Sequence, residues 1–147
     1  MAVAVEKFDA DAIVTGKYDR DELTLEIAPA KIGSVCGFLK YDQQFIRLSS
    51  VTAVDRYPAE PRFEVVYHLH SIERNERLRL KCRLEGTNPE IESVTSVWRS
   101  ANWYEREVFD LFGIGFRNHP DLRRIMMPED WEGHPLRKDY PVTGYRV

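Results

Sequence analysis

The chain has 147 residues and a mass of 17.2 kDa, close to the commonest size of a single domain and sufficient for one hydrophobic core. With 43% hydrophobic and 31% charged residues, the composition is that of a compact protein and excludes disordered, collagen-like and disulfide-rich classes. The formal net charge of −3 lacks the basic excess that phosphate neutralisation requires, so nucleic acid is not an expected partner.

Charges interrupt every apolar run well before the roughly 20 residues that a membrane-spanning helix needs. Residues 1–14 lack a basic leader followed by an apolar segment, so we expect residence on the cytoplasmic side. Cys36 and Cys82 are both placed on apolar faces of expected elements, which predicts buried, reduced thiols rather than a disulfide.

The first expected element is a half-buried strand over residues 22–27, where Leu and Ile alternate with polar residues. Residues 29–40 follow with the pattern of an amphipathic helix that starts at Pro29. Its apolar stripe would consist of Ile32, Val35, Cys36 and Leu39.

Three further strands are predicted over residues 45–55, 62–72 and 77–85, the last two joined as a hairpin through residues 73–76. The strand over 77–85 has the clearest pattern, because Leu and Cys alternate with basic residues along its length. We therefore expect one buried face and one face that is solvated or meets acidic groups.

Beyond the turn at residues 86–89 the period becomes helical. Ile91, Val94 and Trp98 predict one helix. A second, which stops at Gly113, is predicted from Ala101, Tyr104, Val108 and Leu111. Strands that precede helices favour an α+β two-layer sandwich, in which a mostly antiparallel sheet carries helices on one face.

Residues 114–147 differ from the rest, because glycine and proline recur too often for regular structure. We predict an α+β domain over residues 1–113 and an extended C-terminal docking segment over residues 114–147. The segment carries too much apolar surface for a free linker, so a partner protein is the expected cover.

Two glycine or histidine patterns give only weak functional signals. Gly113-Ile114-Gly115 follows a helix instead of opening one, so a helix C-cap is favoured over a phosphate site. His68 and His70 share one face of a strand, but a third metal ligand at a recognisable spacing is missing.

Acidic residues in the second helix could build an acid/base site with His119. The candidates are Glu105, Glu107 and Asp110. Arginines crowd the same region, however, and guanidinium groups hold carboxylates ionised in structural pairs. Structural ion pairing that involves Arg106, Arg117, Arg123 and Arg124 is therefore the favoured interpretation, with catalysis as the alternative.

Aromatic side chains also cluster in this region, and they could mark a quinone or flavin pocket. At helical spacing, aromatics more often belong to a core or an interface, which is the favoured interpretation. The residues are Trp103, Tyr104, Phe109, Phe112 and Phe116.

Residues 105–113 (EREVFDLFG), followed by residues 119–126 (HPDLRRIM), resemble the signature of the C subunit of respiratory complex I. Residues 130–141 (DWEGHPLRKDYP) resemble a second hallmark of that family. The two motifs occur in the family's order and cover about residues 102–145.

The resemblance implies a noncatalytic peripheral-arm subunit of a proton-translocating NADH-quinone oxidoreductase. Such a subunit scaffolds the large hydrogenase-like D subunit, near the cluster-bearing B and I subunits, on the cytoplasmic face of the inner membrane. It would bind no cofactor itself, since FMN, iron–sulfur clusters and quinone belong to partner subunits. Related subunits of membrane-bound hydrogenases and other-donor quinone reductases remain the alternative, and the short chain leaves open a compact complex.

The same resemblance assigns the partner contacts to the C-terminal segment. The alternative is that this segment folds back over its own domain. The expected docking residues are Trp131, Leu136, Arg137, Lys138, Asp139 and Tyr140.

Overall fold

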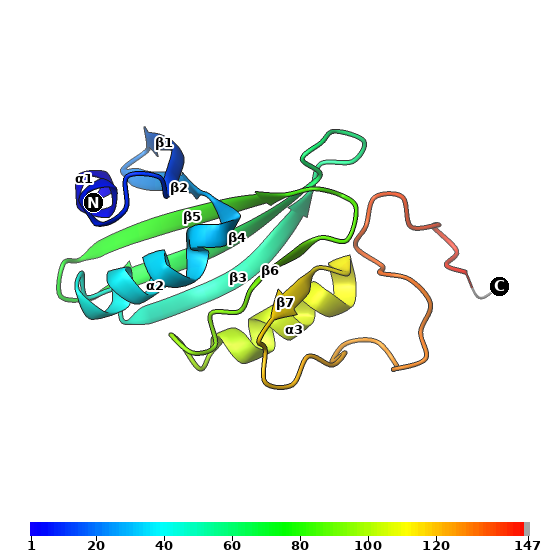
Figure 1. Cartoon of the computed structure of the whole chain (residues 1–147). Helices are drawn as coiled ribbons and strands as arrows, with labels where there is room; N and C mark the ends of the chain where they lie inside the picture. The colour runs from blue at the N-terminus through cyan, green and yellow to red at the C-terminus, as the bar shows by residue number, and fades with distance from the viewer. Residues whose placement is uncertain (146–147) are drawn as a thin grey trace.

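The computed structural model describes residues 1–145, so the last two residues of the predicted segment 114–147 lie outside the described part. The chain runs through a short N-terminal helix and a hairpin into an αβββ unit, and ends in a helix and an irregular segment (Figure 1). The elements are α1 (Ala2–Phe8), β1 (Ile13–Asp19), β2 (Glu22–Ile27), η1 (Pro29–Lys31), α2 (Ile32–Tyr41), β3 (Arg47–Asp55), β4 (Phe63–Ser71), β5 (Glu76–Leu84), β6 (Glu90–Glu92), α3 (Ala101–Phe112) and β7 (Gly115–Arg117).

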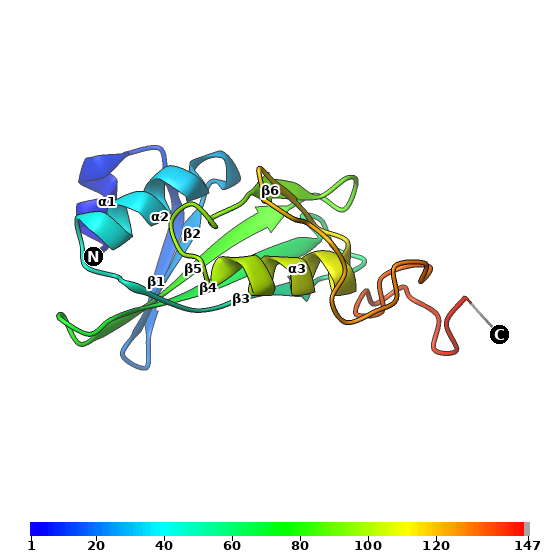
Figure 2. The same cartoon turned by 90° about the horizontal axis from the view of Figure 1, so that it is seen from below.

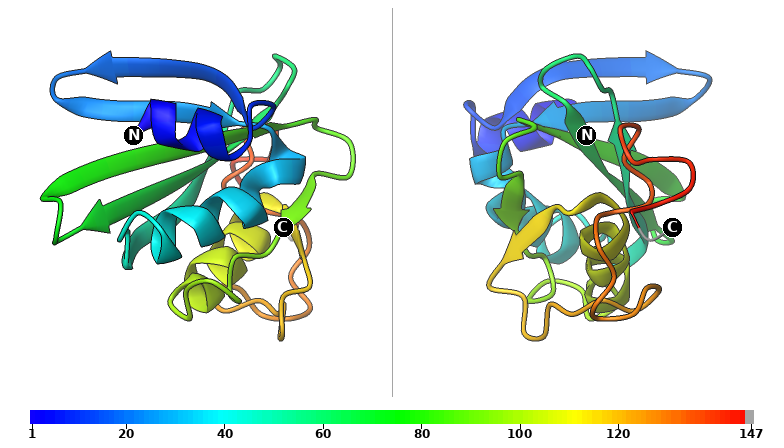
Figure 3. Two further views of the ribbon diagram at one scale, coloured as in Figure 1. Left: turned by 60° about the vertical axis from the view of Figure 1, so that its left-hand side comes forward. Right: turned by 90° about the vertical axis from the view of Figure 1, so that its right-hand side faces the viewer.

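Five strands form the main sheet in the order β1-β2-β5-β4-β3. Every neighbouring pair is antiparallel except β2 and β5, which run parallel. The chain leaves β2 through α2, and β3 and β4 come before β5 in sequence. Helices α2 and α3 lie on the same face of this sheet, and its other face carries no helix (Figures 2 and 3). The predicted α+β sandwich with a mostly antiparallel sheet is confirmed.

The core lies between the helices and the covered sheet face, where the alternation in the sequence becomes alternation of burial. Leu78, Leu80, Cys82 and Leu84 of β5 are buried, with basic side chains between them on the uncovered face. The predicted stripe of α2 is buried against the same core. Both thiols are free and buried, as predicted.

The N-terminal region has more structure than the sequence predicted, because α1 and β1 precede the first expected strand. Helix α1 packs on α2 through a stacked Phe8–Phe38 ring pair, with centroids 4.4 Å apart. Strand β1 pairs with β2, although nearly all of its residues are exposed and show no alternation of buried and exposed positions. Its conformation therefore depends on pairing with β2 and not on a periodic sequence pattern.

The helix predicted from Ile91, Val94 and Trp98 is wrong. Residues 90–92 form β6, which pairs in parallel with β7 in a small second sheet, and turns follow up to α3. The three side chains are all buried in the core, and the Trp98 indole Nε1–H donates to the Phe45 carbonyl at 3.3 Å. Helical spacing of apolar residues also fits a strand followed by tight turns when the whole run is covered by the core.

Helix α3 begins and ends where the sequence predicted, and Gly113 caps it in the left-handed conformation with φ 74°. A Cβ at this position would lie 2.6 Å from the His134 ring, so the C-terminal segment itself crosses close to the cap. Among residues 1–145, none of the helices combines the length and apolar character that crossing a bilayer requires.

Candidate functional site

The candidate site is the junction between α3 and the segment that follows it. Asp110 projects from the buried side of α3 and is fully covered. Its Oδ2 accepts backbone N–H groups of Ile125, Met126 and Met127 at 3.1, 2.7 and 2.9 Å. Its Oδ1 lies 3.4 Å from Nε of Arg124. A carboxylate that receives three backbone donors and a guanidinium fixes the path of the following loop.

Glu105 lies one turn earlier and is fully buried. It accepts hydrogen bonds from Oγ of Ser93 at 2.6 Å and from the backbone N–H of Val94 at 2.7 Å. Burial raises the pKa of this carboxyl to about 7, and the two hydrogen bonds only partly oppose that effect. Glu105 therefore ties α3 to the turn that precedes it.

His119 approaches the same carboxyl, with its Nε2 3.9 Å from Glu105 Oε2. The backbone N–H of Asp121 donates to its Nδ1 at 3.0 Å, which leaves the proton on Nε2 to face the Asn102 carbonyl at 3.2 Å. Burial lowers the pKa of His119, so the neutral imidazole with this tautomer is favoured.

The remaining residues of the predicted cluster lie nearer the surface. Arg106 donates from Nε to the Arg123 carbonyl at 3.1 Å and stacks on Trp103, 5.0 Å from the ring centroid. Arg123 pairs with Asp121 at 2.8 Å. Glu107 is exposed and makes no ion pair within residues 1–145, so the structure separates it from Glu105 and Asp110.

The end of α3 is capped by residues from far along the chain. Nδ1 of His134 lies 2.9 Å from the Asp110 carbonyl, the Leu136 N–H donates to the Leu111 carbonyl at 3.0 Å, and Arg137 Nε donates to the Phe112 carbonyl at 2.6 Å. These carbonyls have no hydrogen-bond partner within the helix. The positive charge of Arg137 near them also interacts favourably with the negative end of the helix dipole.

A second anchor joins the same segment to the sheet. Arg62 pairs with Asp55 at the end of β3, with distances of 2.8 and 2.9 Å, and with Asp139 at 2.7 Å. The Lys138 N–H donates to Asp55 Oδ2 at 2.8 Å. Burial raises the pKa of Asp55, but hydrogen bonds from Arg62, Lys138 and Tyr57 outweigh it and hold the pKa at about 2.

The expected docking residues thus divide into two groups. Arg137, Lys138 and Asp139 are anchored on the domain through the contacts above. Leu136 keeps its side chain outward and is 52% exposed. Trp131 Nε1 donates to the Tyr140 hydroxyl at 3.0 Å, and the Tyr140 ring meets that of Tyr145 edge-on at 5.4 Å.

Three residues of this site were missed at the sequence level: Asp55, Arg62 and Ser93. Each is distant in sequence from the motif that it contacts, and a single acid or base at the end of a strand gives no periodic signal. Phe112 and Phe116 are buried in the core, with Tyr104 and Phe109 packed against it, as the favoured interpretation predicted. Trp103 is exposed.

Together the fold and the junction define a class, a small α+β domain whose irregular C-terminal segment is tied by buried carboxylates to one helix and one strand end. The family model described as respiratory-chain NADH dehydrogenase, 30 kDa subunit, matches residues 25–146. The chain belongs to this family, and the membership expected from the two motifs is confirmed.

Known relatives agree with that placement. A Geobacter sulfurreducens protein, named as the C subunit of NADH-quinone oxidoreductase, is 51% identical over 140 residues, covering 95% of this chain and 86% of the relative. The Neurospora crassa mitochondrial NADH-ubiquinone oxidoreductase 30.4 kDa subunit is 50% identical over 128 residues, covering 86% of this chain and 45% of the relative.

Two solved structures share the fold. A trypsin-resistant fragment of Nqo5 superposes with a TM-score of 0.71 and 29% identity, covering 82% of this chain and 97% of the fragment. A chain of the archaeal membrane-bound sulfane sulfur reductase, described as a respiratory membrane complex, superposes with a TM-score of 0.81 and 26% identity. That match covers 96% of this chain and 84% of the other.

Proposed function

We propose that the chain is a noncatalytic peripheral-arm subunit of a proton-translocating NADH-quinone oxidoreductase. In this role it scaffolds the large quinone-cavity subunit while electrons pass from NADH to quinone. The observation that carries the proposal is the Geobacter sulfurreducens relative, a C subunit of NADH-quinone oxidoreductase by name, which is 51% identical across 95% of this chain.

The docking surface proposed is the C-terminal segment, and its construction supports that role. Asp110 and Asp55 hold the backbone of the segment in place, so little conformational entropy remains to be lost when a partner binds. Leu136, Met126 and Tyr145 keep more than half of their surface exposed along the same segment. Fixed backbone with outward apolar side chains is typical of a preformed interface.

The finer assignments follow from the same proposal. The large partner is the hydrogenase-like D subunit, and the cluster-bearing B and I subunits are neighbours. FMN, iron–sulfur clusters and quinone are held by partner subunits and none by this chain. The complex places the chain on the cytoplasmic face of the inner membrane, or on the equivalent side of an organellar membrane.

A second candidate rests on the sulfane sulfur reductase chain, which superposes over 96% of this chain. In this alternative the chain is the equivalent subunit of a membrane-bound hydrogenase or of a reductase with another donor. A stand-alone enzyme that uses Glu105, Glu107, Asp110 and His119 receives no support, since Asp110 is occupied by backbone donors and Glu107 points away.

The proposal is tested by purifying the complex through an affinity tag on its large subunit. We expect this chain to co-purify in equal amount, NADH-quinone activity to disappear when the chain is deleted, and the purified chain alone to be inactive. Activity of the purified chain alone would refute the noncatalytic role. Co-purification with a complex that oxidises dihydrogen or reduces sulfane sulfur would establish the second candidate.

A further inference from the structure

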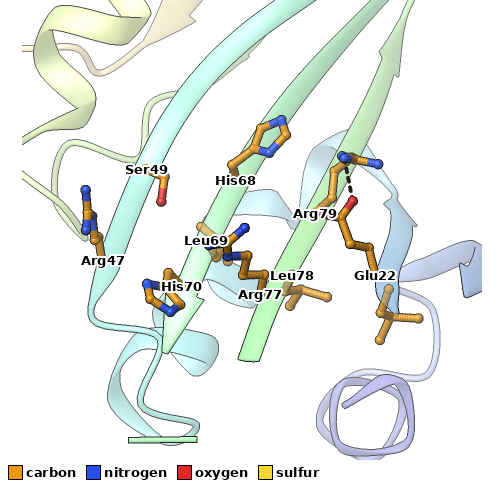
Figure 4. Close-up of a pocket in the computed structure, with 10 residues that line it drawn as sticks. Glu22, Arg47, Ser49, His68, Leu69, His70, Arg77, Leu78 and Arg79 are labelled. Atoms are coloured by element: carbon orange, nitrogen blue, oxygen red, sulfur yellow. Dashed lines mark hydrogen bonds and ion pairs between the residues drawn. The ribbon is translucent and has the colours of Figure 1, made fainter. Parts of the chain in front are cut away.

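The uncovered face of the main sheet carries a row of basic groups. Arg47 of β3 is the direct cross-strand neighbour of His70 in β4, and His70 is the neighbour of Arg77 in β5. Leu48, Leu69 and Leu78, each next in sequence to one of the three, are buried in the core, so the three side chains project to the face without helices. Figure 4 shows them at one end of the sheet.

The adjacent row is mostly neutralised. His68 lies opposite Arg79, and Arg79 donates to Glu22 of β2 at 2.9 Å. Burial lowers the pKa of His68, so the neutral form of this imidazole is favoured near pH 7. Glu22 is thus already engaged by Arg79 (Figure 4).

Arg47 and Arg77 have no such acid. Neither forms an ion pair within residues 1–145, and the two stand on either side of His70 in the same cross-strand row. Adjacent strands are about 4.8 Å apart, so the backbones that carry the two arginines lie about 10 Å apart, on either side of His70. Counting three arginines against Glu22, this region carries a charge of +2 in a chain whose net charge is −3.

The surface here is hollowed into an open depression of about 360 Å³. Ser49, which lies at the register shift of β3 between Leu48 and Ser50, is one of the residues that line it. The depression runs across four strands, β2, β5, β4 and β3, which suits an extended chain bearing several carboxylates better than a single small ion. Guanidinium groups bind carboxylates with paired hydrogen bonds, and they are enriched at interface hot spots.

We propose that this basic row, Arg47, His70 and Arg77, is a second docking surface, which binds an acidic polypeptide segment of a neighbouring subunit. This proposal requires that the chain belongs to a multi-subunit complex, but it does not require that the C-terminal segment is a docking surface. Carboxylates of the partner would lie between the two unpaired arginines and pair with them. The contact would be sensitive to salt, because both arginines are near the surface.

The test begins with the assembled complex, in which a photo-crosslinking benzoylphenylalanine replaces Ser49. Irradiation should join this position to another subunit, within a segment rich in Asp and Glu, and mass spectrometry identifies the peptide. A crosslink only within this chain, to a phospholipid, or to a segment without acidic residues would overturn the proposal.

Charge reversal provides the second measurement. Arg47→Glu combined with Arg77→Glu should lower the chain's retention in the complex by about tenfold at about 150 mM salt. The control, Lys7→Glu combined with Arg99→Glu, makes the same change in net charge at exposed positions elsewhere. Melting temperatures of both double variants establish that each is folded, and Arg47→Gln with Arg77→Gln replaces the reversal if it is not.

The decisive outcome is rescue. Replacing the acids of the crosslinked segment by lysine should restore assembly of the charge-reversed chain, because the pairing is re-formed with opposite sign. Retention that is unchanged by the reversal, or that reciprocal replacement fails to restore, would refute the acidic-segment contact. Neither result alters the test of the C-terminal docking surface, which uses different residues.

Discussion

Asp110 and Arg124 face each other at 3.4 Å across the junction between α3 and the C-terminal segment. The two residues come from the two halves of the first family motif, residues 105–113 and 119–126. The aspartate closes the contact by accepting three backbone N–H groups from residues 125–127. The spacing of the motif thus has a physical cause, because one half supplies the acceptor that folds the other.

Asp110→Asn should destabilise the domain. The amide removes the charge that pairs with Arg124 and replaces one acceptor oxygen by a donor that faces backbone N–H groups. Breaking one side of a buried ion pair typically costs about 3–5 kcal/mol in the free energy of unfolding. Urea denaturation of the purified chain measures the loss.

Glu107→Gln is the matched control, because it makes the same acid-to-amide change on the exposed side of α3. We expect a change within about 0.5 kcal/mol. Equal losses for the two variants would contradict the assignment of Asp110 as the anchor.

Glu105 should make stability depend on pH. Its pKa is about 7 in the folded chain and 4.5 without burial, so the folded state binds the proton more tightly. Stability from this group is complete below pH 4.5 and declines as pH rises towards about 7, by roughly 3 kcal/mol in total.

Three histidines whose pKa is lowered by burial, His68, His119 and His134, act in the opposite direction, since their protonation favours the unfolded chain at low pH. Comparison with Glu105→Gln cancels their effect. Between about pH 4.5 and pH 7 the native chain should lose roughly 3 kcal/mol relative to the variant. Parallel pH profiles would show that Glu105 does not titrate in this range.

Asp55→Asn should release the C-terminal segment from the sheet, because Asp55 holds both Arg62 and the Lys138 N–H. Tryptic cleavage after Lys138 should accelerate by about tenfold or more, as expected when a local opening becomes about 1.4 kcal/mol easier. Asp19→Asn, in an exposed pair with Lys17, serves as the control. Unchanged cleavage in Asp55→Asn would show that another contact holds the segment.

Two glycine-to-alanine substitutions should have opposite signs. Gly113→Ala places a Cβ 2.6 Å from His134 at a positive φ, so we expect a loss of about 1–3 kcal/mol. Gly37→Ala lies within α2 with no atom inside 4 Å of the new Cβ, and should stabilise by up to about 1 kcal/mol. Thermal unfolding distinguishes them, and a harmless Gly113→Ala would contradict the close crossing at the cap.

Local patterns were sufficient for most of the sheet and for α3. The alternation of Leu78, Leu80 and Cys82 is so regular that it determines both the strand and its buried face. Helix α3 combines an apolar stripe with Gly113 at its end, and both signals are local. Where burial covers a run on all sides, as around Ile91 and Val94, periodicity no longer separates helix from strand and turn.

The site was predictable only in part. Asp110 and Arg124 could be expected to pair because they lie in one motif, but the three backbone donors that make the contact strong depend on loop geometry. Asp55 and Arg62 lie more than 70 residues from Asp139, and no sequence pattern joins them. Contacts of that kind follow from topology, which brings the end of β3 beside the C-terminal segment.

The central claim is that the C-terminal segment docks on the large subunit of the complex, and Leu136→Asp tests it most directly. The side chain is 52% exposed, so the variant should fold with an unchanged melting temperature. Val14→Asp, in β1 and 56% exposed, is the control, because it is distant from both proposed docking surfaces. With the tag on the large subunit, recovery of Leu136→Asp should fall by about tenfold while the control is recovered fully. Full recovery of folded Leu136→Asp would contradict the claim.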